Sequence, residues 1–438
     1  MLQTPFRGFL GTSAGRRTFL GLQALALALA LLLSSCGGGD DRTKAKLRFV
    51  NASVYPSLDL RMEGNLRFGG VGYGAGAAYQ EIDPDETDSR VSVAGSTTAL
   101  VSLTPTLVRK KHYSLLAWGR EGELKTVLLN DDQTAADAGK ARLQILQAST
   151  DAGALDVYLT ADADALTGAV PVLSGAAAGT LSALTVVDAG SWRLRVTGAG
   201  DREDLRLDVR GLSLPSTSVQ TLLLTPSSGG VLVQALLLTQ QGAVSARAVE
   251  HARVRVAGAL PSGGAVGVTL GGLSLLSETA SPVVGRYQWV PAGEQALVVR
   301  AAGSVLPSST VSLTPGSEAT LLVHAAGAAP ALSWLADDNR LPVASSAAKL
   351  RLVNGLAASS DALSLTASAL PVASAVLPGT SSTASALTAA SVSELSVRAA
   401  GAAQPLYVND EPALKAAGVY TVFVLGGPVP LGLLRVDR

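Results

Sequence analysis

Residues 46–53 read KLRFVNAS, and three similar stretches follow along the chain. They are ARLQILQAS at 141–149, ARVRVAGAL at 252–260 and AKLRLVNGL at 348–356. Each places a basic residue between apolar ones, which is the period-two pattern of a β-strand with one solvated face. Because the copies begin roughly 100 residues apart, they predict four tandem units of one β fold.

The ends of these units also recur. The stretch LLAWGREGELKTVLLNDD at 115–132 aligns without a gap to LLVHAAGAAPALSWLADD at 321–338, and both read as two strands joined by a glycine-containing turn. The stretches LLLTPSSGGVLVQALLLTQQ from Leu222 and VFVLGGPVPLGLLRVD from Val422 follow the same plan. We therefore place the units at residues 45–138, 139–247, 250–345 and 347–438.

The composition favours an all-β fold with aliphatic cores. The chain has 438 residues, of which 47% are hydrophobic and only 4% aromatic. Its apolar runs are short, turn residues separate them, and no strong helical period appears after the N-terminal segment. These features predict tandem immunoglobulin-like or transthyretin-like β-sandwich domains. We expect the second unit to fold alone, and neighbouring sandwiches to form a rod with limited contact between them.

Residues 1–35 have the layout of a secretory signal peptide. Three arginines and no acidic residue precede the apolar run at 19–33, which is short for a bilayer span. The run leads into LSSC, which resembles the lipobox of bacterial lipoproteins. The resemblance implies that Cys36, the only cysteine, receives a diacylglycerol and becomes the first residue of the mature chain. The alternative is a lone cysteine that is buried as a small apolar residue.

A lipid on Cys36 would tether the protein to a membrane through residues 36–44, a flexible glycine-rich segment. Lipoproteins that stay in the inner membrane usually carry aspartate after the cysteine, whereas this chain has Gly37. We therefore expect a lipid-anchored protein of the cell envelope, in the outer membrane rather than the inner one. The stretch GRRTFL at 15–20 also resembles a twin-arginine export signal, so this route and the general secretory route both stay open.

The first unit carries a family resemblance. LRFVNASVYPSLDL at 47–60 and VGYGAGAAYQEIDP at 71–84 resemble the bacterial family called domain of unknown function 4397, and ASTDAGALDVYL at 148–159 repeats the first motif. Departures are Val54 in place of the usual proline, Gln147 in place of asparagine, and the loss of the aspartate in the third unit. The resemblance implies β-sandwich modules on exported, often lipid-anchored proteins, and it implies no catalytic residues.

The sequence gives little support for catalysis or for nucleic-acid binding. The three histidines are far apart without metal-ligand spacing, and no Gly-x-Ser-x-Gly motif is present. GGVGYGAG at 69–76 lacks the lysine and the helix context of a phosphate-binding loop. The 34 basic and 34 acidic residues balance, so no nucleic-acid partner is expected. We predict that the protein is not an enzyme and needs no cofactor.

Several recurring side chains allow two interpretations. The pairs at 131–132 and 337–338, both Asp-Asp, suit calcium or a solvated turn, but the second unit has Gln240 and Gln241 there, so we predict no metal site. Asp59 and Asp156 follow the first strands, and we favour hydrogen bonds to turn amides over ligand binding. The four tryptophans lie in strand patterns, which favours packing over sugar stacking.

The second unit is the longest, and its surplus residues lengthen the connections between strands. The densest charge cluster of the body lies there, and it forms the candidate binding loop Asp201, Arg202, Glu203 and Asp204. Loops on a rigid sandwich are common recognition sites, although a solvated loop explains the cluster equally well. The sequence therefore predicts a non-catalytic envelope protein that binds a protein or a glycan. A structural spacer is the alternative, and a hydrolase is a weaker one.

Overall fold

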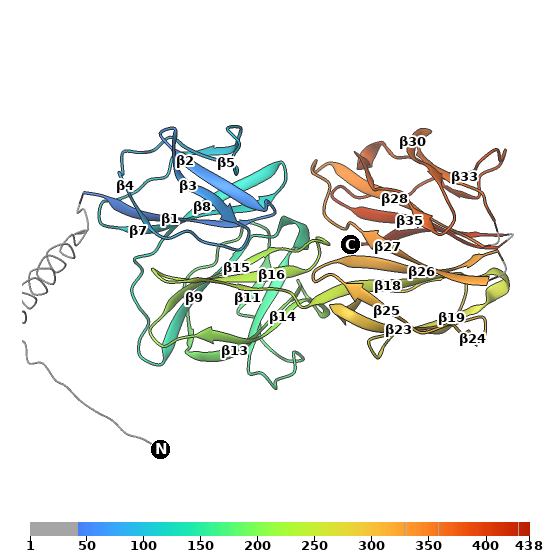
Figure 1. Ribbon diagram of the computed structural model, residues 1–438, viewed down its shortest axis with the longest axis horizontal. Helices are drawn as coiled ribbons and strands as arrows, with labels where there is room; N and C mark the ends of the chain where they lie inside the picture. The colour runs from blue at the N-terminus through green and yellow to red at the C-terminus, as the bar shows by residue number, and fades with distance from the viewer. Residues whose placement is uncertain (1–42, 328, 358, 428) are drawn as a thin grey trace, which may run out of the picture.

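The computed structural model describes residues 43–327, 329–357, 359–427 and 429–438, so the signal segment and Cys36 lie outside the described residues. Within these ranges the chain forms β-strands and three short 3-10 helices, and no helix is long and apolar enough to cross a membrane. The strands make eight sheets, two for each of four successive repeats. The predicted all-β architecture of tandem β-sandwiches is confirmed (Figure 1).

The strands of the first two repeats alternate with short turns. In the first repeat they are β1 (Ala45–Ser53), β2 (Ser57–Met62), β3 (Asn65–Gly72), β4 (Gln80–Ile82), β5 (Ser89–Val93), β6 (Ala99–Leu103), β7 (His112–Arg120) and β8 (Glu123–Asn130). In the second they are β9 (Lys140–Gln147), β10 (Leu155–Thr160), β11 (Leu173–Ala176), β12 (Thr185–Asp188), β13 (Gly190–Gly198), β14 (Asp201–Leu214), β15 (Val219–Pro226), β16 (Val233–Thr239) and β17 (Val244–Arg247), with the 3-10 helix η1 (Thr150–Ala152) after β9.

The last two repeats follow the same plan. In the third repeat the strands are β18 (His251–Ala259), β19 (Ala265–Leu270), β20 (Leu273–Ala280), β21 (Val283–Val284), β22 (Gln288–Pro291), β23 (Gly293–Ala301), β24 (Ser304–Val305), β25 (Ser309–Leu313), β26 (Glu318–Ala326) and β27 (Ala329–Asp337), with η2 (Pro261–Gly263) after β18. In the fourth they are β28 (Ala347–Leu356), β29 (Leu363–Ala367), β30 (Leu370–Val376), β31 (Thr380–Ser381), β32 (Ser385–Thr388), β33 (Leu395–Ala399), β34 (Tyr407–Asn409), β35 (Val419–Gly426) and β36 (Leu431–Val436), with η3 (Ala389–Ser391) after β32.

Each repeat packs the sheet that contains its first strand against a second sheet. The first repeat has the orders β4-β1-β7-β8 and β3-β2-β5-β6, and the second has β12-β9-β15-β16-β17 and β11-β10-β13-β14. The third has β21-β18-β26-β27 and β20-β19-β23-β24, and the fourth has β31-β28-β35-β36 and β30-β29-β33-β34. In every first sheet the central pair is parallel: β1 with β7, β9 with β15, β18 with β26 and β28 with β35.

The first sheet of the first repeat is apolar on both faces. Alternate residues of a strand point to opposite faces, so Phe49 joins the core inside the sandwich whereas Val50 points outward. Val50 lies in a second apolar cluster with Leu146 and Leu223 of the next repeat. The sequence pattern predicted a solvated face for these strands, and that prediction is wrong. Arg48, on this outward face, is only 2% exposed because the second repeat covers it.

The third and fourth repeats pair in the same way. Ala257 and Leu322 on the outward face of the third repeat share a cluster with Val353, Phe423 and Leu425 of the fourth. Figure 1 shows the result, with the first two repeats in blue and green stacked on one side and the last two in yellow and red on the other. The expected rod with limited contact between neighbours is therefore wrong. Sheets with two apolar faces bury the second face against a neighbour because water contact with it is unfavourable.

This pairing changes what an isolated repeat should do. A fragment of residues 139–249 contains its own core, which includes Val249, but it leaves Leu146, Leu223 and Leu236 uncovered. We expect the fragment to fold with a β-type circular dichroism spectrum and to self-associate in analytical ultracentrifugation. A fragment of residues 43–249, in which the first repeat covers that face, should stay monomeric at the same concentration. Equal monomeric behaviour of both fragments would contradict the role given to this interface.

Candidate functional site

Asp59 and Asp156 hold turns together. Asp59 accepts hydrogen bonds from the backbone N–H of Gly70 at 2.7 Å and of Gly95 at 2.9 Å. Asp156 accepts the matching bonds from Gly175 at 2.7 Å and Gly200 at 2.9 Å. Gly70 and Gly175 have positive φ angles of 65° and 60°, which place their N–H groups toward the carboxylates. The favoured interpretation of these aspartates, as acceptors for turn amides, is confirmed at Gly95 and Gly200, while Gly70 and Gly175 are amides of strands β3 and β11.

The recurrent acidic pairs lie at the interfaces between paired repeats. Asp131 accepts hydrogen bonds from the hydroxyls of Tyr79 and Ser114, both at 2.5 Å, and Asp337 accepts them from Tyr287 at 2.5 Å and Thr320 at 2.6 Å. Both aspartates are buried. Among the described residues, no group of three or more His, Cys, Asp or Glu side chains is placed to hold a metal ion. These carboxylates therefore act in packing, as internal acceptors.

The interface of the third and fourth repeats contains a reciprocal exchange of charge. Arg255 of the third repeat pairs with Asp437 of the fourth, while Arg351 of the fourth pairs with Asp337 of the third. Each arginine also donates through Nε to a threonine of its own repeat, Thr320 for Arg255 at 2.8 Å and Thr421 for Arg351 at 2.9 Å. The two repeats thus meet through a pseudo-two-fold contact, like the isologous interface of a dimer.

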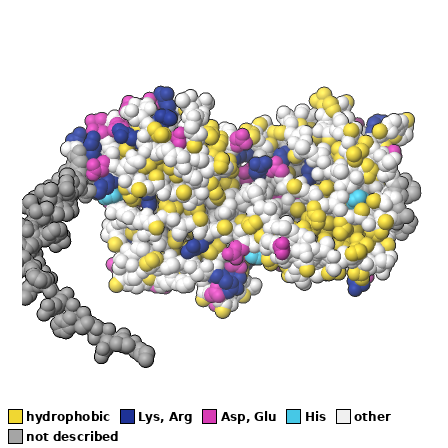
Figure 2. Space-filling model, in the orientation of Figure 1, with side chains coloured by type: hydrophobic (Ala, Val, Ile, Leu, Met, Phe, Trp, Pro, Cys, Tyr) yellow, Lys and Arg dark blue, Asp and Glu magenta, His cyan; other side chains and the backbone are white. Residues whose placement is uncertain are grey.

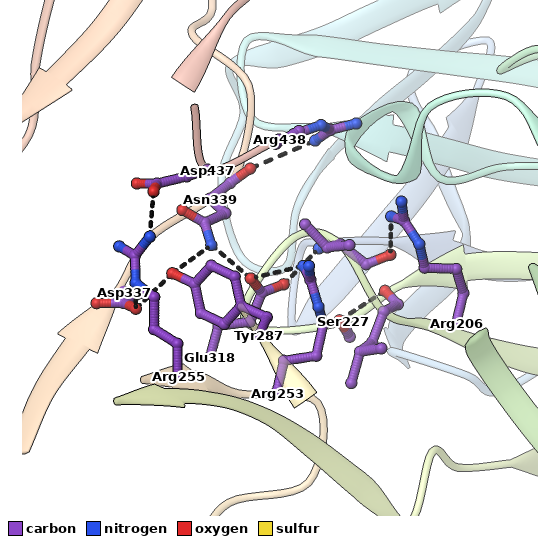
Figure 3. A network of polar contacts seen from close by, with 12 residues as sticks. Arg206, Ser227, Arg253, Arg255, Tyr287, Glu318, Asp337, Asn339, Asp437 and Arg438 are labelled. Carbon is purple, nitrogen blue, oxygen red and sulfur yellow. Dashed lines mark hydrogen bonds and ion pairs between the residues drawn. The ribbon is translucent and has the colours of Figure 1, made fainter. Parts of the chain in front are cut away.

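A second polar network joins the two pairs of repeats (Figure 3). Glu318 of the third repeat accepts hydrogen bonds from the backbone N–H of Val231 in the second at 3.0 Å, from Asn339 at 2.5 Å and from Arg253 at 3.0 Å. Burial raises the pKa of Glu318 above its ordinary value, and Arg253 opposes that effect. Arg438 adds a bond to the Asn339 carbonyl at 3.3 Å. These contacts fix the second repeat against the third and fourth.

The predicted binding loop is not a loop. Asp201, Arg202, Glu203 and Asp204 form the start of strand β14, directly after the turn that follows β13. The pairing of β13 with β14 reaches Gly198 and Asp201 with three register irregularities along its length, so the surplus residues around 201–204 extend the hairpin within the sheet. Asp201, Arg202 and Glu203 are exposed. In the view of Figure 2, charged side chains of both signs gather on a projection at the lower edge of the molecule, next to a histidine.

The structure places a cleft farther along the same strand. It has a volume of about 690 Å³ and lies where the second repeat meets the third. Strands β13, β14 and β17 supply one wall, and the start of β18 together with β22 supplies the other. Its polar and aromatic lining consists of Arg193, Asp208, Arg210, Arg247, Glu250, His251 and Trp289. None of the described residues that line it is a serine, a threonine or a cysteine.

One wall of the cleft carries fixed charges. Arg193 and Asp208 form a two-pronged ion pair, with Nε–Oδ1 at 2.8 Å and Nη2–Oδ2 at 2.5 Å. The hydrogen bonds that Arg193 donates to Asp208 raise the pKa of Arg193, which keeps its guanidinium charged. Arg210 pairs with Asp162 at 2.5 Å and is largely exposed. The wall therefore offers N–H donors beside carboxylate acceptors at set positions.

The other wall carries a stacked aromatic pair. The rings of His251 and Trp289 lie 3.5 Å apart between centroids and are tilted by 5°. Desolvation lowers the pKa of His251, which favours the neutral imidazole at pH 7. Trp289 also packs against the core of the second repeat, as the strand pattern predicted for the tryptophans. Both side chains are half-buried and contribute to the lining of the cleft.

Sequence reasoning missed this cleft because its walls come from two repeats. A signal was present in β13 and β14, where Arg193, Arg195, Asp208 and Arg210 place charge on alternate positions of apolar strands. Nothing in the sequence placed His251 beside Trp289, because β18 and β22 are joined by about 28 residues of other strands and turns. The predicted cluster at 201–204 lies on the same strand but outside the lining of the cleft.

Comparison with known proteins gives a family and one distant structure. The model of the family described as "Domain of unknown function (DUF4397)" matches residues 45–158 and 252–366, just over half of the chain. No curated protein matches the chain. A solved structure from Bacteroides uniformis ATCC 8492, provisionally described as a cell adhesion protein, shares 11% identity with a TM-score of 0.21, and the match covers 46% of this chain and 98% of that one. Both family matches begin at the first strand of a paired set of repeats, β1 and β18.

Proposed function

Since the chain belongs to the DUF4397 family, we propose that it is a non-catalytic cell-envelope protein that binds a glycan in the cleft between its second and third repeats. Its tandem family domains support a binding or scaffold role. The cleft is the observation that carries the glycan assignment. An aromatic pair in the same lining as fixed donors and acceptors suits the apolar face and the hydroxyl groups of a sugar ring.

The absence of a nucleophile among the described lining residues supports binding without catalysis. Asp208 is engaged by Arg193, and Glu250 is exposed, so neither carboxylate lies in the apolar surroundings that are typical of a general acid. A spacer role is the second candidate, and the network around Glu318 favours it because it holds the two pairs of repeats together.

Binding can be tested with the mature chain, purified without its lipid, on immobilised envelope glycans. We expect Arg247→Ala and Glu250→Ala each to weaken binding about tenfold, the effect of losing one charge-assisted hydrogen bond. Arg90→Ala removes an exposed arginine on β5 of the first repeat, outside the cleft, and should bind like the wild type. Binding of the wild type to none of the immobilised glycans would overturn the glycan assignment and favour the spacer. Unchanged binding in both cleft variants would place the glycan site outside the cleft.

The membrane anchor is a separate part of the proposal. The LSSC sequence that ends at Cys36 supports it. We expect the protein in growing cells to incorporate a fatty-acid probe and to fractionate with membranes, and Cys36→Ala to lose both properties. Two or more acyl chains are needed for stable attachment, since each buried methylene contributes only about 0.8 kcal/mol. Persistent labelling of the alanine variant would refute lipidation at this residue.

A further inference from the structure

The two paired interfaces differ in the side chain at one equivalent position. An arginine there reaches across the interface of the third and fourth repeats, whereas a shorter residue in the interface of the first and second repeats leaves a cavity. In the parallel ladder of β28 and β35, Arg351 lies opposite Thr421, and in that of β9 and β15 Gln144 lies opposite Thr221. Gln144 is therefore the counterpart of Arg351. Because glutamine is shorter than arginine and ends in an amide, it cannot carry a guanidinium across the interface.

The acceptors that Arg351 uses are kept in the first interface. Arg351 donates to Asp337 Oδ1 and, at 3.0 Å, to the carbonyl of Ala336. Asp131 is the counterpart of Asp337, because each stands at the end of the second hairpin strand and accepts hydroxyl hydrogen bonds from a tyrosine and from a serine or threonine. Asn130 then takes the place of Ala336, and its carbonyl, which accepts a hydrogen bond from Gln133 Nε2 at 3.3 Å, has a second lone pair for a ligand.

Among the described residues, the partners of the Asp131 carboxylate all contact one of its two oxygens, Oδ2. Its contacts with Tyr79, with Ser114 and with Arg48 at 3.7 Å all end on Oδ2. In Asp337 the hydroxyl bonds also end on Oδ2, and Oδ1 receives Arg351. Arg48 turns its terminal nitrogens away, toward the carbonyls of Gly242 at 2.6 Å and Thr239 at 3.1 Å.

A cavity of about 200 Å³ lies at this place in the first interface. Asp131, Gln144, Thr221 and Gln240 line it, and the exposed Asn130 also contributes to its wall. We propose that this cavity is a binding site for a guanidinium group, such as that of an arginine side chain. The ligand would take the acceptors that Arg351 occupies from within the chain in the other interface.

The test is a calorimetric titration of the mature full-length protein with small cations. Thermal denaturation of the same protein measures the melting temperature. Butylguanidinium should bind with a Kd on the order of 1 mM, as expected for so small a ligand. Butyltrimethylammonium has the same charge but no N–H donors, and it should bind at least tenfold more weakly. Free L-arginine and the peptide acetyl-Gly-Arg-Gly-amide distinguish an amino acid from a peptide as the source of the group.

Two reciprocal variants give matched controls. Gln144→Arg should fill the cavity from within, abolish butylguanidinium binding and raise the melting temperature. Arg351→Gln should open the equivalent cavity in the other interface, lower the melting temperature and raise the stoichiometry from one to two. Equal binding of both cations by the wild type, no binding of butylguanidinium, or unchanged binding by Gln144→Arg would overturn the proposal. If a variant does not fold, the comparison of the two cations on the wild type still decides.

Discussion

Replacement of Asp337 with alanine is expected to lower the free energy of unfolding by about 3–5 kcal/mol, because it removes one partner from a buried ion pair. The Asp337 side chain is fully buried, and Arg351, which pairs with it across the interface, is only 7% exposed. Without the carboxylate, Arg351 would remain in the interface as an unpaired charge, and the hydroxyls of Tyr287 and Thr320 would lose their acceptor. Urea denaturation followed by circular dichroism measures the change.

The control for this prediction is an exposed ion pair of the same repeat. Glu278 and Arg300 approach to 3.7 Å with more than half of each side chain exposed, so Glu278→Ala should change stability by no more than about 0.5 kcal/mol. The double variant Asp337→Ala with Arg351→Met removes both buried charges and should recover part of the loss. If Asp337→Ala costs as little as Glu278→Ala, the charge exchange does not stabilise the interface.

The second large effect is expected from Phe423→Ala, at about 3–5 kcal/mol. Phe423 lies on β35 with no exposed surface, in the apolar cluster between the third and fourth repeats. Its ring also lies 5.0 Å from the guanidinium of Arg255, so truncation removes a contact that shields that charge. The cost combines the lost burial of the ring with the cavity that remains.

Leu370→Ala serves as the comparison for Phe423→Ala. Leu370 begins β30 in the same repeat and is 70% exposed, so its truncation should change stability by less than about 0.5 kcal/mol. Both variants can be measured by thermal and urea denaturation of the mature chain. A loss for Phe423→Ala below about 1 kcal/mol would mean that the two repeats are held by their connections and not by this interface.

Parts of the structure could be predicted because they depend on local pattern. Period-two alternation and the recurrence of one stretch established the strands and the repeats, and the sandwich architecture followed from them. Asp59 and Asp156 could be interpreted correctly for the same reason, since an aspartate after a strand commonly bonds turn amides. The length of the second repeat reveals its extra residues, but the sequence does not place residues 201–204 in a strand, because a bulged hairpin and a loop have similar polar composition.

The sequence by itself determined that this protein is built from repeated β-sandwich units, because the alternation of apolar residues is a local property of each strand. Only the tertiary structure decided that the outward faces are buried in pairs. A basic residue such as Arg48 suggests contact with water, yet it becomes buried once the next repeat supplies carbonyl acceptors. The cleft also had to await the tertiary structure, since its two walls belong to different repeats and meet only when the network around Glu318 joins them.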